Sequence, residues 1–259
     1  MKLPNSCRWL LFLPISLLLG QAPGLAAELA EIQARGRLIV AVKDNLRPLG
    51  FRDGAGNLQG LEIDIARRLA AELLGDADAI EFVPASNQER LQLLLADTVD
   101  LVVAQLNATP ARSRVMAFSR AYYFDGTALV TANAAIATLE DLAGWEVAIL
   151  AGSQTATALP NQLPESVTFV PVTSYQDALA RLERGEVAAF AGDTSVLAGW
   201  VQEYPQYRLL LTDIFRRRLS VGMLKGAQHE PLRRQVDAAI VRWQESGWLA
   251  ETHQRWGLP

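Results

Sequence analysis

The segment Val99–Gly126 reads VDLVVAQLNATPARSRVMAFSRAYYFDG and runs from a strand-like start into residues typical of a helix N-terminus. Thr109 and Pro110 suit the beginning of a helix, because a threonine oxygen accepts from the free N–H groups and proline needs no donor there. Arg112 falls in the predicted first turn, where its charge adds to the partial positive charge of a helix N-terminus. An anion bound at this position neutralises both charges. The segment therefore predicts a strand end that binds an anion.

Strand-like and helix-like runs alternate on both sides of this position. Before it we expect strands at 37–43, 80–84 and 99–105, with helices at 62–75 and 88–98. After it we expect strands at 145–150, 167–172 and 186–193, with helices at 152–159 and 174–185. Such alternation is typical of βαβ units and of a mostly parallel sheet flanked by helices. Because the unit occurs twice, the sequence predicts an α/β protein with two lobes.

Two further runs are expected to connect the lobes. Tyr122–Asn133 is strand-like without a helical period, and Leu219–Gly226 is the predicted returning strand, followed by two helices within 230–257. We expect lobe 1 at 28–121 and 220–259, hinge crossings at 122–126 and 215–219, and lobe 2 at 127–214. Two sheets joined in this way leave a cleft, and open α/β sheets bind ligands beyond the carboxyl ends of their strands.

The first residues are predicted to be a secretory signal peptide at 1–27. The apolar run Trp9–Gly20 is shorter than the roughly 20 residues that span a membrane, and small residues follow it at Pro23–Ala27. We expect cleavage near Ala26 or Ala27 and a periplasmic protein. The remainder is a folded globular chain by composition, since the whole sequence is 50% hydrophobic and 20% charged.

Cleavage also changes the chemistry that remains. It removes Cys7, the single cysteine, which excludes disulfides, thiolate metal sites and cysteine catalysis from the mature chain. It removes Lys2 and Arg8, so 22 of the 24 positive residues stand against 28 acidic ones and the formal charge moves from −4 to −6. This acidic balance argues against a nucleic-acid partner. His229 and His253 are expected at the surface, and we expect no metal and no cofactor.

Two smaller features are expected to be structural. Arg52–Gly60 is Gly-rich without the spacing of a dinucleotide-binding loop, and predicts a hairpin turn. Trp243, Trp248 and Trp256 occur where helix-packing residues are expected.

Five stretches, taken in order, resemble the periplasmic amino-acid-binding proteins of ABC importers, the extracellular solute-binding family 3. They are Gly56–Ala70, Val99–Gly126, Asp141–Ser153, Gly185–Asp193 and Ser246–Gly257. The resemblance covers nearly the whole mature chain. It implies a type II periplasmic-binding-protein fold whose two lobes close on a free L-amino acid, and a membrane permease as partner. We expect a monomer.

The resemblance also implies roles for single residues. Arg112 matches the residue that binds the ligand's α-carboxylate, and a planar guanidinium can make two parallel bonds to a carboxylate. N–H groups near Thr109 supply further donors. Asp193 matches the ammonium ligand, although an aspartate before a helical run is also an ordinary N-cap, and both roles can coexist. Ser153 or Gln154 would donate to the carboxylate from lobe 2, with plain capping as the alternative for Ser153.

The rest of the implied pocket departs from the commoner family pattern. Two positions that usually carry aromatic rings around the ligand's side chain align with Leu46 and Asn87. Gln105 and Asn107 occupy the strand end that normally offers backbone and small polar groups. The pocket is therefore expected to be polar.

Basic residues near the pocket bear on the ligand's charge. An acidic position of the family aligns with Lys43, or with Asp44 if the alignment slides by one residue. Positive charge from Lys43 or Arg47 would favour acidic or small polar ligands over cationic ones, unless both side chains point to solvent as long basic chains usually do. Arg114 lies about 200° around a helix axis from Arg112 and is expected in solvent.

Three classes of function remain open. A transport receptor needs a closable cleft and surfaces that dock on a permease. An enzyme on the same fold, such as a cyclohexadienyl-dehydratase-like protein, needs a positioned general acid or base, and only Asp193 stands at a matched position. A ligand-sensing domain of a larger receptor is the third class. The sequence favours the transport receptor.

Overall fold

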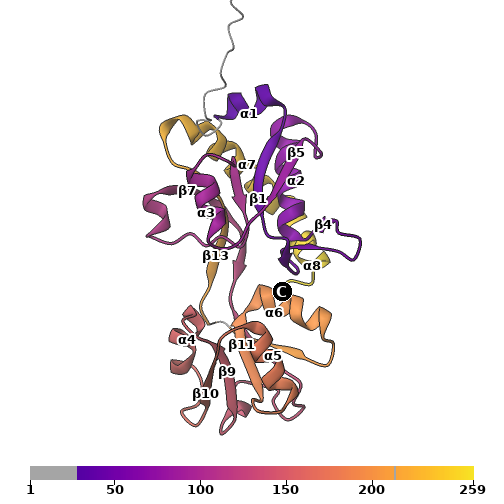
Figure 1. The fold of residues 1–259 in the computed structure, drawn as a ribbon, viewed down its shortest axis with the longest axis vertical. Helices are drawn as coiled ribbons and strands as arrows, with labels where there is room; N and C mark the ends of the chain where they lie inside the picture. The colour runs from indigo at the N-terminus through magenta and orange to yellow at the C-terminus, as the bar shows by residue number, and fades with distance from the viewer. Residues whose placement is uncertain (1–27, 213) are drawn as a thin grey trace, which may run out of the picture.

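The computed structural model describes residues 28–212 and 214–259. The predicted signal peptide at 1–27 lies outside the described residues. Figure 1 shows two lobes stacked along the long axis, with the strands β7 and β13 running from the upper lobe toward the lower one. Within the described ranges, no helix has the length and apolar character needed to cross a membrane.

The first lobe is built on a five-stranded sheet in the order β5-β1-β6-β13-β7. Its strands are β1 (Leu38–Val42), β5 (Ile80–Pro84), β6 (Leu101–Val103), β7 (Met116–Asp125) and β13 (Arg217–Leu224). The strands β5, β1 and β6 are parallel, and β13 runs antiparallel to β6 and β7. Its helices are α1 (Leu29–Arg35), α2 (Leu61–Leu74), α3 (Glu89–Leu95), α7 (Glu230–Glu245) and α8 (Trp248–Arg255). The predicted alternation of strands and helices is confirmed here, with boundaries shifted by a few residues.

The second lobe repeats this plan with the sheet order β10-β9-β11-β8-β12. Its strands are β8 (Thr127–Thr131), β9 (Glu146–Leu150), β10 (Thr168–Val172), β11 (Ala189–Asp193) and β12 (Arg208–Leu211). The strands β10, β9 and β11 are parallel, whereas β8 is antiparallel to β11 and β12. Its helices are α4 (Gln154–Ala158), α5 (Tyr175–Glu183) and α6 (Thr194–Glu203). Each lobe therefore has a mixed sheet with three parallel strands flanked by helices.

A small antiparallel sheet of β2 (Asn45–Leu46), β3 (Gly50–Arg52) and β4 (Leu58–Gln59) lies beside the first lobe. The hairpin between β3 and β4 confirms the turn predicted at Arg52–Gly60.

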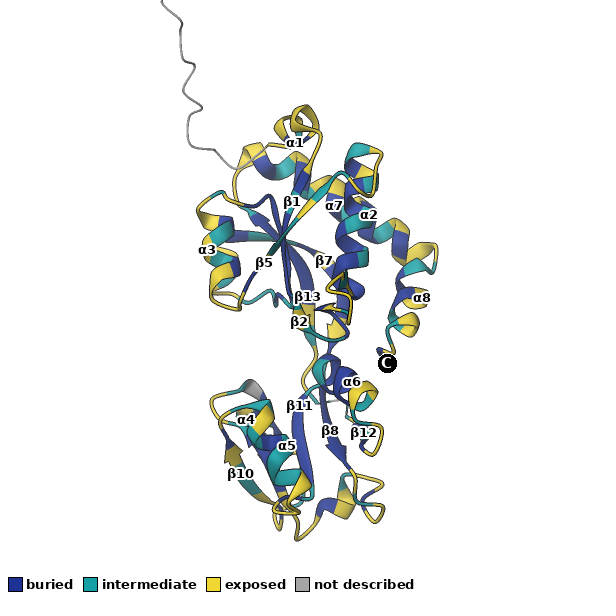
Figure 2. Ribbon diagram, turned by 45° about the vertical axis from the view of Figure 1, so that its right-hand side comes forward, coloured by how far each residue is buried: buried dark blue, intermediate teal, exposed yellow. Residues whose placement is uncertain are grey.

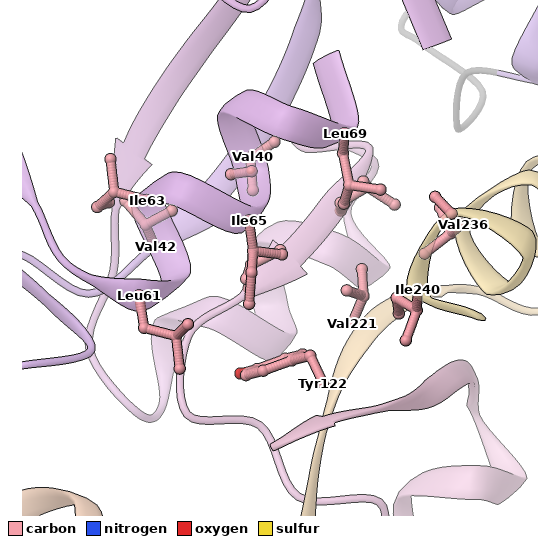
Figure 3. Packing of buried hydrophobic residues seen from close by; sticks show 14 of the residues in the cluster. Val40, Val42, Leu61, Ile63, Ile65, Leu69, Tyr122, Val221, Val236 and Ile240 are labelled. Atoms are coloured by element: carbon pink, nitrogen blue, oxygen red, sulfur yellow. The ribbon is translucent and has the colours of Figure 1, made fainter. Parts of the chain in front are cut away.

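The strands of the first lobe are buried on both faces, as near-continuous runs of apolar residues require. Val40 and Val42 face the cluster formed with α2, α7 and α8, whereas the intervening Ala41 faces the cluster under α3. This alternation follows the two-residue period of a strand. Ile65 and Leu69 of α2 are fully buried in the first cluster, and Figure 3 shows them among the side chains that pack there. Figure 2 shows the same division, with buried residues along the strands and exposed residues on the outer helix faces.

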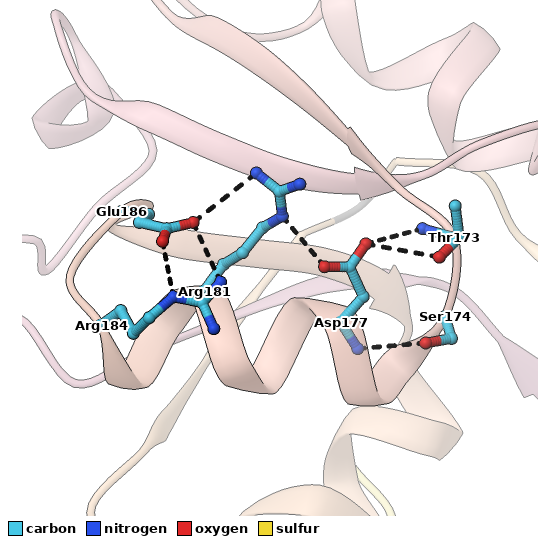
Figure 4. A network of polar contacts seen from close by, with 6 residues as sticks. All are labelled: Thr173, Ser174, Asp177, Arg181, Arg184 and Glu186. Carbon is cyan, nitrogen blue, oxygen red and sulfur yellow. Dashed lines mark hydrogen bonds and ion pairs between the residues drawn. The ribbon is translucent and has the colours of Figure 1, made fainter.

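Local polar contacts fix where α5 begins. Ser174 is its N-cap and accepts from the Asp177 N–H at 3.0 Å, while the Asp177 carboxylate accepts from the Thr173 N–H at 3.1 Å (Figure 4). Arg181, one turn further on, donates to Asp177 at 3.1 Å. The reciprocal caps satisfy N–H groups that a helix start leaves unpaired.

Three local predictions need correction or refinement. The helix predicted after Thr109 is one turn of 3-10 helix, η1 (Arg112–Arg114), because β7 begins two residues later. The strand-like run at 122–133 divides into β7 and β8 at Gly126.

The two histidines were expected at the surface, and neither is fully exposed. His229 is buried, because it packs where the chain turns into α7. His253 is half-buried, with a ring nitrogen 3.0 Å from the Tyr122 carbonyl oxygen. The tryptophans pack as expected, with Trp243 against Trp248 at 5.2 Å between ring centroids.

A buried carboxylate ties the first sheet to the strand that leaves the lobe. Glu62 of α2 is 0% exposed, and its Oε1 accepts from the Tyr122 hydroxyl and from the Gln105 N–H, both at 2.5 Å. Burial raises the pKa of Glu62, whereas these two donors act in the opposite direction. Tyr122 lies on β7 and Gln105 follows β6, so one side chain joins three elements.

The Tyr122→Phe variant should therefore be destabilised by about 1–3 kcal/mol, because it leaves the buried Glu62 carboxylate with one donor fewer. Urea denaturation followed by circular dichroism measures this free energy of unfolding. The control is Tyr204→Phe. Tyr204 is half-buried, and the variant loses only a hydroxyl while its ring keeps the contact with Trp200 (6.1 Å between centroids). This control should stay within about 0.5 kcal/mol of the parent. Equal stabilities for the two variants would show that the Glu62 contact does not matter.

Candidate functional site

A cavity of about 420 Å³ lies between the lobes. Its lobe-1 side includes Asn87, Asn107, Thr109 and Arg112, and its lobe-2 side includes Ser153, Tyr175 and Asp193, with Arg217 at the start of β13. It follows the carboxyl ends of the parallel strands β6, β9 and β11, where an open α/β sheet is expected to bind ligands. The structure therefore brings six of the nine site residues predicted from the sequence (Asn87, Asn107, Thr109, Arg112, Ser153 and Asp193) into the lining of one cavity.

The 3-10 turn η1 positions Arg112 in this cavity. Thr109 accepts from the Arg112 N–H at 3.3 Å through its hydroxyl, so the predicted capping by threonine is present in the shorter turn. The Arg112 Nη1 donates to the Asn107 carbonyl at 3.0 Å, which leaves other guanidinium donors for a ligand. Burial lowers the pKa of Arg112, so its positive charge is poorly solvated and an anion there would stabilise it. Arg114, in the same turn, is exposed as expected.

Asn107 offers an acceptor beside Arg112. Its Oδ1 is buried and has no hydrogen-bond partner among the described residues. A buried acceptor of this kind costs free energy until a donor reaches it. Asn87, by contrast, lies exposed where α3 approaches the cavity.

Asp193 ends β11 and immediately precedes α6, yet its side chain does not cap that helix. One carboxylate oxygen pairs with the Arg217 guanidinium, and the other lies 3.4 Å from the Gln105 Nε2. The N-cap alternative for Asp193 is therefore wrong, because both oxygens are directed to partners at the cleft. Gln105 does not appear among the cavity's lining residues, but it reaches the same carboxylate.

The cap of α6 comes from a distant part of the chain. Asp125, at the end of β7, accepts from the Ser195 N–H at 2.9 Å and from the Ser195 hydroxyl at 2.7 Å. Asp125 is 1% exposed, and its pKa is raised first by burial and then by the nearby Asp193 charge. Asp125 therefore caps α6, which is the role that the sequence analysis gave to Asp193 as an alternative.

Arg217 is a residue of this cavity that the sequence analysis missed. It stands in the run Arg216–Arg218 within the predicted hinge segment 215–219, and its side chain is 13% exposed. A basic run usually indicates a solvated face, so only its place between two lobes could have drawn attention to it.

On the second lobe, Ser153 lines the cavity and also caps α4. Its hydroxyl accepts from the Ala156 N–H at 3.1 Å, which confirms the capping interpretation. The first helical residue is Gln154, whose side chain is not among those described. The start of α4 therefore faces the cavity, with one of its N–H groups already satisfied by Ser153.

Leu46 borders a neighbouring cavity of about 230 Å³ between the loop at 45–47, α5 and α6. The two cavities share Tyr175 in their linings. Arg47 is next to it, with its guanidinium 3.8 Å from the Phe51 ring centroid and 3.3 Å from the Glu203 carboxylate. The expectation that Arg47 points to solvent is thus only partly met, since it bridges to the second lobe.

The other basic residue near the predicted pocket is buried. Lys43 is 8% exposed and donates to the Ala85 carbonyl at 3.1 Å, so it neither lines the cavity nor points to solvent. Burial lowers its pKa, with nearby Arg90 as the next cause. Asp44 pairs with Arg52 at 3.3 Å. The structure therefore replaces Lys43 and Arg47 with Arg217 as the extra positive charge beside Arg112.

Buried charges also support the wall of lobe 1. Arg90 is 5% exposed and donates to the Ala104 and Gln105 carbonyls, the latter at 3.2 Å. Its pKa is lowered by burial and then by Arg112. Gln105, held between Arg90 and Glu62, has a φ of 50°. Two buried charged groups thus fix a backbone conformation that is uncommon for a residue other than glycine.

The described residues offer no obvious metal site. Across 28–212 and 214–259, no group of three or more His, Cys, Asp or Glu side chains is placed to hold an ion. The cavity's chemistry is instead that of guanidinium, carboxylate, amide and hydroxyl groups, which suits a small zwitterion.

Comparison with known proteins agrees with this geometry. The family model for bacterial extracellular solute-binding proteins, family 3, matches residues 38–259. A glutamine-binding protein of Geobacillus stearothermophilus is 30% identical over 204 residues, which are 78% of each chain. The ABC transporter glutamine-binding protein of Bacillus subtilis (strain 168) is 25% identical over 231 residues, covering 88% of this chain and 84% of that protein.

Solved structures share the fold. An ancestral cationic amino-acid solute-binding protein has a TM-score of 0.75 at 24% identity, covering 88% of this chain and 99% of that one. The architecture is therefore the expected type II periplasmic-binding-protein fold, with two mixed-sheet lobes. The chain belongs to the bacterial extracellular solute-binding proteins, family 3.

Proposed function

We propose that the protein captures a free amino acid between its lobes and delivers it to the permease of an ABC importer. The observation that carries this is the placement of Arg112 from lobe 1 and Asp193 from lobe 2 in one cavity. An amino acid carries the two complementary charges on a single carbon. The related proteins of Geobacillus stearothermophilus and Bacillus subtilis are named as glutamine-binding, which supports an amino acid as the ligand.

Each predicted side chain then has a part in binding. Arg112 grips the α-carboxylate, with N–H groups near Thr109 as further donors. Asp193 accepts from the ammonium, sharing its oxygens with Arg217 and Gln105. The unpartnered Oδ1 of Asn107 is a second acceptor. This set holds both charges of a zwitterion from opposite sides.

Residues at the margin are assigned smaller parts. Ser153 or Gln154, at the start of α4, is proposed to donate to the carboxylate from lobe 2, and Asn87 to contact the ligand's side chain at the rim. Leu46 stays a proposed contact at the edge of the site, in the neighbouring cavity that shares Tyr175 with this one. The polar lining favours a polar or acidic amino acid. We also propose a monomeric receptor that reaches the periplasm through a signal peptide at 1–27.

We propose no enzymatic activity. An enzyme on this fold needs a general acid or base free to exchange a proton with the substrate. The charged side chains that line the cavity are two arginines and Asp193. Both oxygens of Asp193 already lie against other side chains, so its position suits ligand binding better than proton transfer.

The first test concerns the α-carboxylate. Arg112→Ala should weaken binding of the parent's best amino acid by about 2–5 kcal/mol, as expected when one partner of a buried charge pair is removed. Isothermal titration calorimetry, after a screen of the twenty amino acids on the parent, measures this loss. The control Arg114→Ala removes an exposed arginine from the same turn and should bind like the parent. Equal affinities for both variants would refute the anion assignment.

The second test concerns the ammonium. Asp193→Asn should weaken the same amino acid at least about tenfold, because a carboxylate bond to a charged group becomes a bond to a neutral amide. Its effect on the corresponding 2-oxo acid, which lacks the ammonium, should be smaller. Calorimetry with both ligands gives the two ratios. A variant that weakens both ligands equally would leave Asp193 as a structural residue.

The third test concerns closure about the proposed hinge segments 122–126 and 215–219. A ligand held by both lobes binds the closed form better, and about 5.5 kcal/mol of difference moves a population from about 1% to about 99% closed. Spin labels at Asp76 and Gln162, both exposed and on different lobes, should report a shorter distance when the ligand is added.

The same labels on Arg112→Ala provide the control, at ligand concentrations that saturate the parent. No shortening is expected there. If the parent binds its amino acid and the interlobe distances stay unchanged, closure is not the signal of loading, and a pre-closed binder becomes the better model.

A further inference from the structure

The cavity holds one guanidinium more than a neutral zwitterion can satisfy. Its charged lining residues are Arg112, Asp193 and Arg217, two guanidinium groups against one carboxylate. An α-carboxylate takes one guanidinium and an α-ammonium takes the carboxylate. Among the lining side chains one guanidinium then has no carboxylate of its own, because the buried Asp125, whose charge also acts on Arg217, does not line the cavity and is hydrogen-bonded to Ser195.

Arg217 is the guanidinium left over. It pairs with one oxygen of Asp193, and its Nε is buried without a hydrogen-bond partner in the described part of the chain. A guanidinium has five N–H donors, so a single carboxylate oxygen satisfies only part of it. Buried donors without acceptors destabilise a site until a ligand supplies them. Arg217 therefore has both the charge and the free donors to hold a second anion.

The two arginines also approach the cavity from neighbouring chain segments. The Arg112 Nη1 bonds the Asn107 carbonyl at 3.0 Å, and Asn107 forms an antiparallel bridge with Leu219. Arg217 stands two residues before Leu219 on β13, roughly 7 Å along the strand. The chain segments that carry the two arginines are thus neighbours, and both side chains line the same cavity.

We propose that Arg217 is a specificity-determining residue that binds a carboxylate in the ligand's side chain, so that the ligand is a dicarboxylic amino acid. The inference rests on the proposed function, because Arg112 and Asp193 must hold the α-carboxylate and the ammonium. The net negative charge of such a ligand equals the excess positive charge of the lining. A side-chain carboxylate can accept two parallel bonds from a planar guanidinium, whereas a side-chain amide cannot. This difference would separate the acids from their amides.

A purely structural part for Arg217 makes a different prediction. If Arg217 served only to orient Asp193, its removal would disturb the ammonium contact of every amino acid alike. Recognition of a side-chain carboxylate instead predicts a loss that falls on acids and spares amides. The comparison of acid with amide therefore separates the two roles.

The experiment is calorimetry with L-glutamate, L-aspartate, L-glutamine and L-asparagine on the parent, Arg217→Gln and Arg218→Gln. The parent should bind one of the acids about 10- to 100-fold more tightly than its amide, the range expected for bonds to a charged group. Arg217→Gln should lose most of that ratio, because the larger loss of affinity falls on the acid. Arg218→Gln alters an exposed arginine one position along and should keep the parent's ratio.

The outcomes distinguish this inference from the function on which it rests. A parent that binds amino acids but prefers an amide or a neutral side chain overturns the assignment of Arg217 and leaves the receptor standing. An equal loss for acid and amide in Arg217→Gln does the same. A parent that binds none of the twenty amino acids overturns both. If Arg217→Gln fails to fold by circular dichroism, the parent's own ratio of acid to amide decides the question.

Discussion

The N–H groups in the first turn of α6 need acceptors outside the helix. The Asp125 carboxylate on β7 accepts from the N–H and the hydroxyl of Ser195. Because this acceptor comes from the strand that leaves lobe 1, Asp193 at the start of the same helix is released from capping. Its carboxylate is then available to Arg217, Gln105 and a ligand. Because Asp125 and not Asp193 caps α6, the cleft keeps a carboxylate that could accept from an ammonium group.

Asp125 and Asp193 also bring two carboxylates close together near the hinge, which raises the pKa of the buried Asp125 further than burial alone does. Arg217 offsets this repulsion by pairing with Asp193. Beside Arg112, the positive charge of the buried Arg90 is opposed by the Arg112 charge and favoured by Glu62. Both groups of charges thus lie at the cleft, where a bound amino acid would add charges of its own.

Much of this arrangement could be predicted from the sequence, because it depends on local patterns. The alternating runs gave the order of strands and helices, and Thr109 with Pro110 located the turn that carries Arg112. Asp193 was placed at the end of a strand by the same periodicity. These features rely on short-range geometry, namely strand period, helix capping and the position of strand ends at one edge of a sheet.

The direction of long side chains could not be predicted in this way. Lys43 was expected near the ligand or in solvent, and it lies buried against the Ala85 carbonyl instead. The Arg47 side chain lies over the Phe51 ring and pairs with Glu203, which is distant in sequence and in the other lobe. Arg217 meets Asp193 only because β13 returns beside the end of β11. Such contacts depend on tertiary packing, which a single sequence does not encode in any local pattern.

The lobes already touch through α6, and this contact would constrain how they can move. Gly199 of α6 packs so closely on the loop before β3 that a Cβ at that position would lie 2.1 Å from the Arg47 carbonyl oxygen. Three residues further along α6, Gln202 donates to the Trp256 carbonyl at 2.8 Å, where the C-terminal end of the chain approaches this helix (Figure 1). Side chains packed at this density resist compression.

The proposed closure of the cleft would therefore not bring α6 any nearer to Arg47. The lobes would either rotate about this contact or slide along it, while β7 and β13 bend where they pass between the sheets. Tyr122 on β7 is bonded to Glu62, and Glu62 also holds the Gln105 backbone at the cleft. A rotation that pulls on β7 is thus transmitted to a residue whose side chain reaches Asp193. The proposed hinge and the proposed ligand site thus share one buried carboxylate, Glu62, which would couple ligand binding to the position of the lobes.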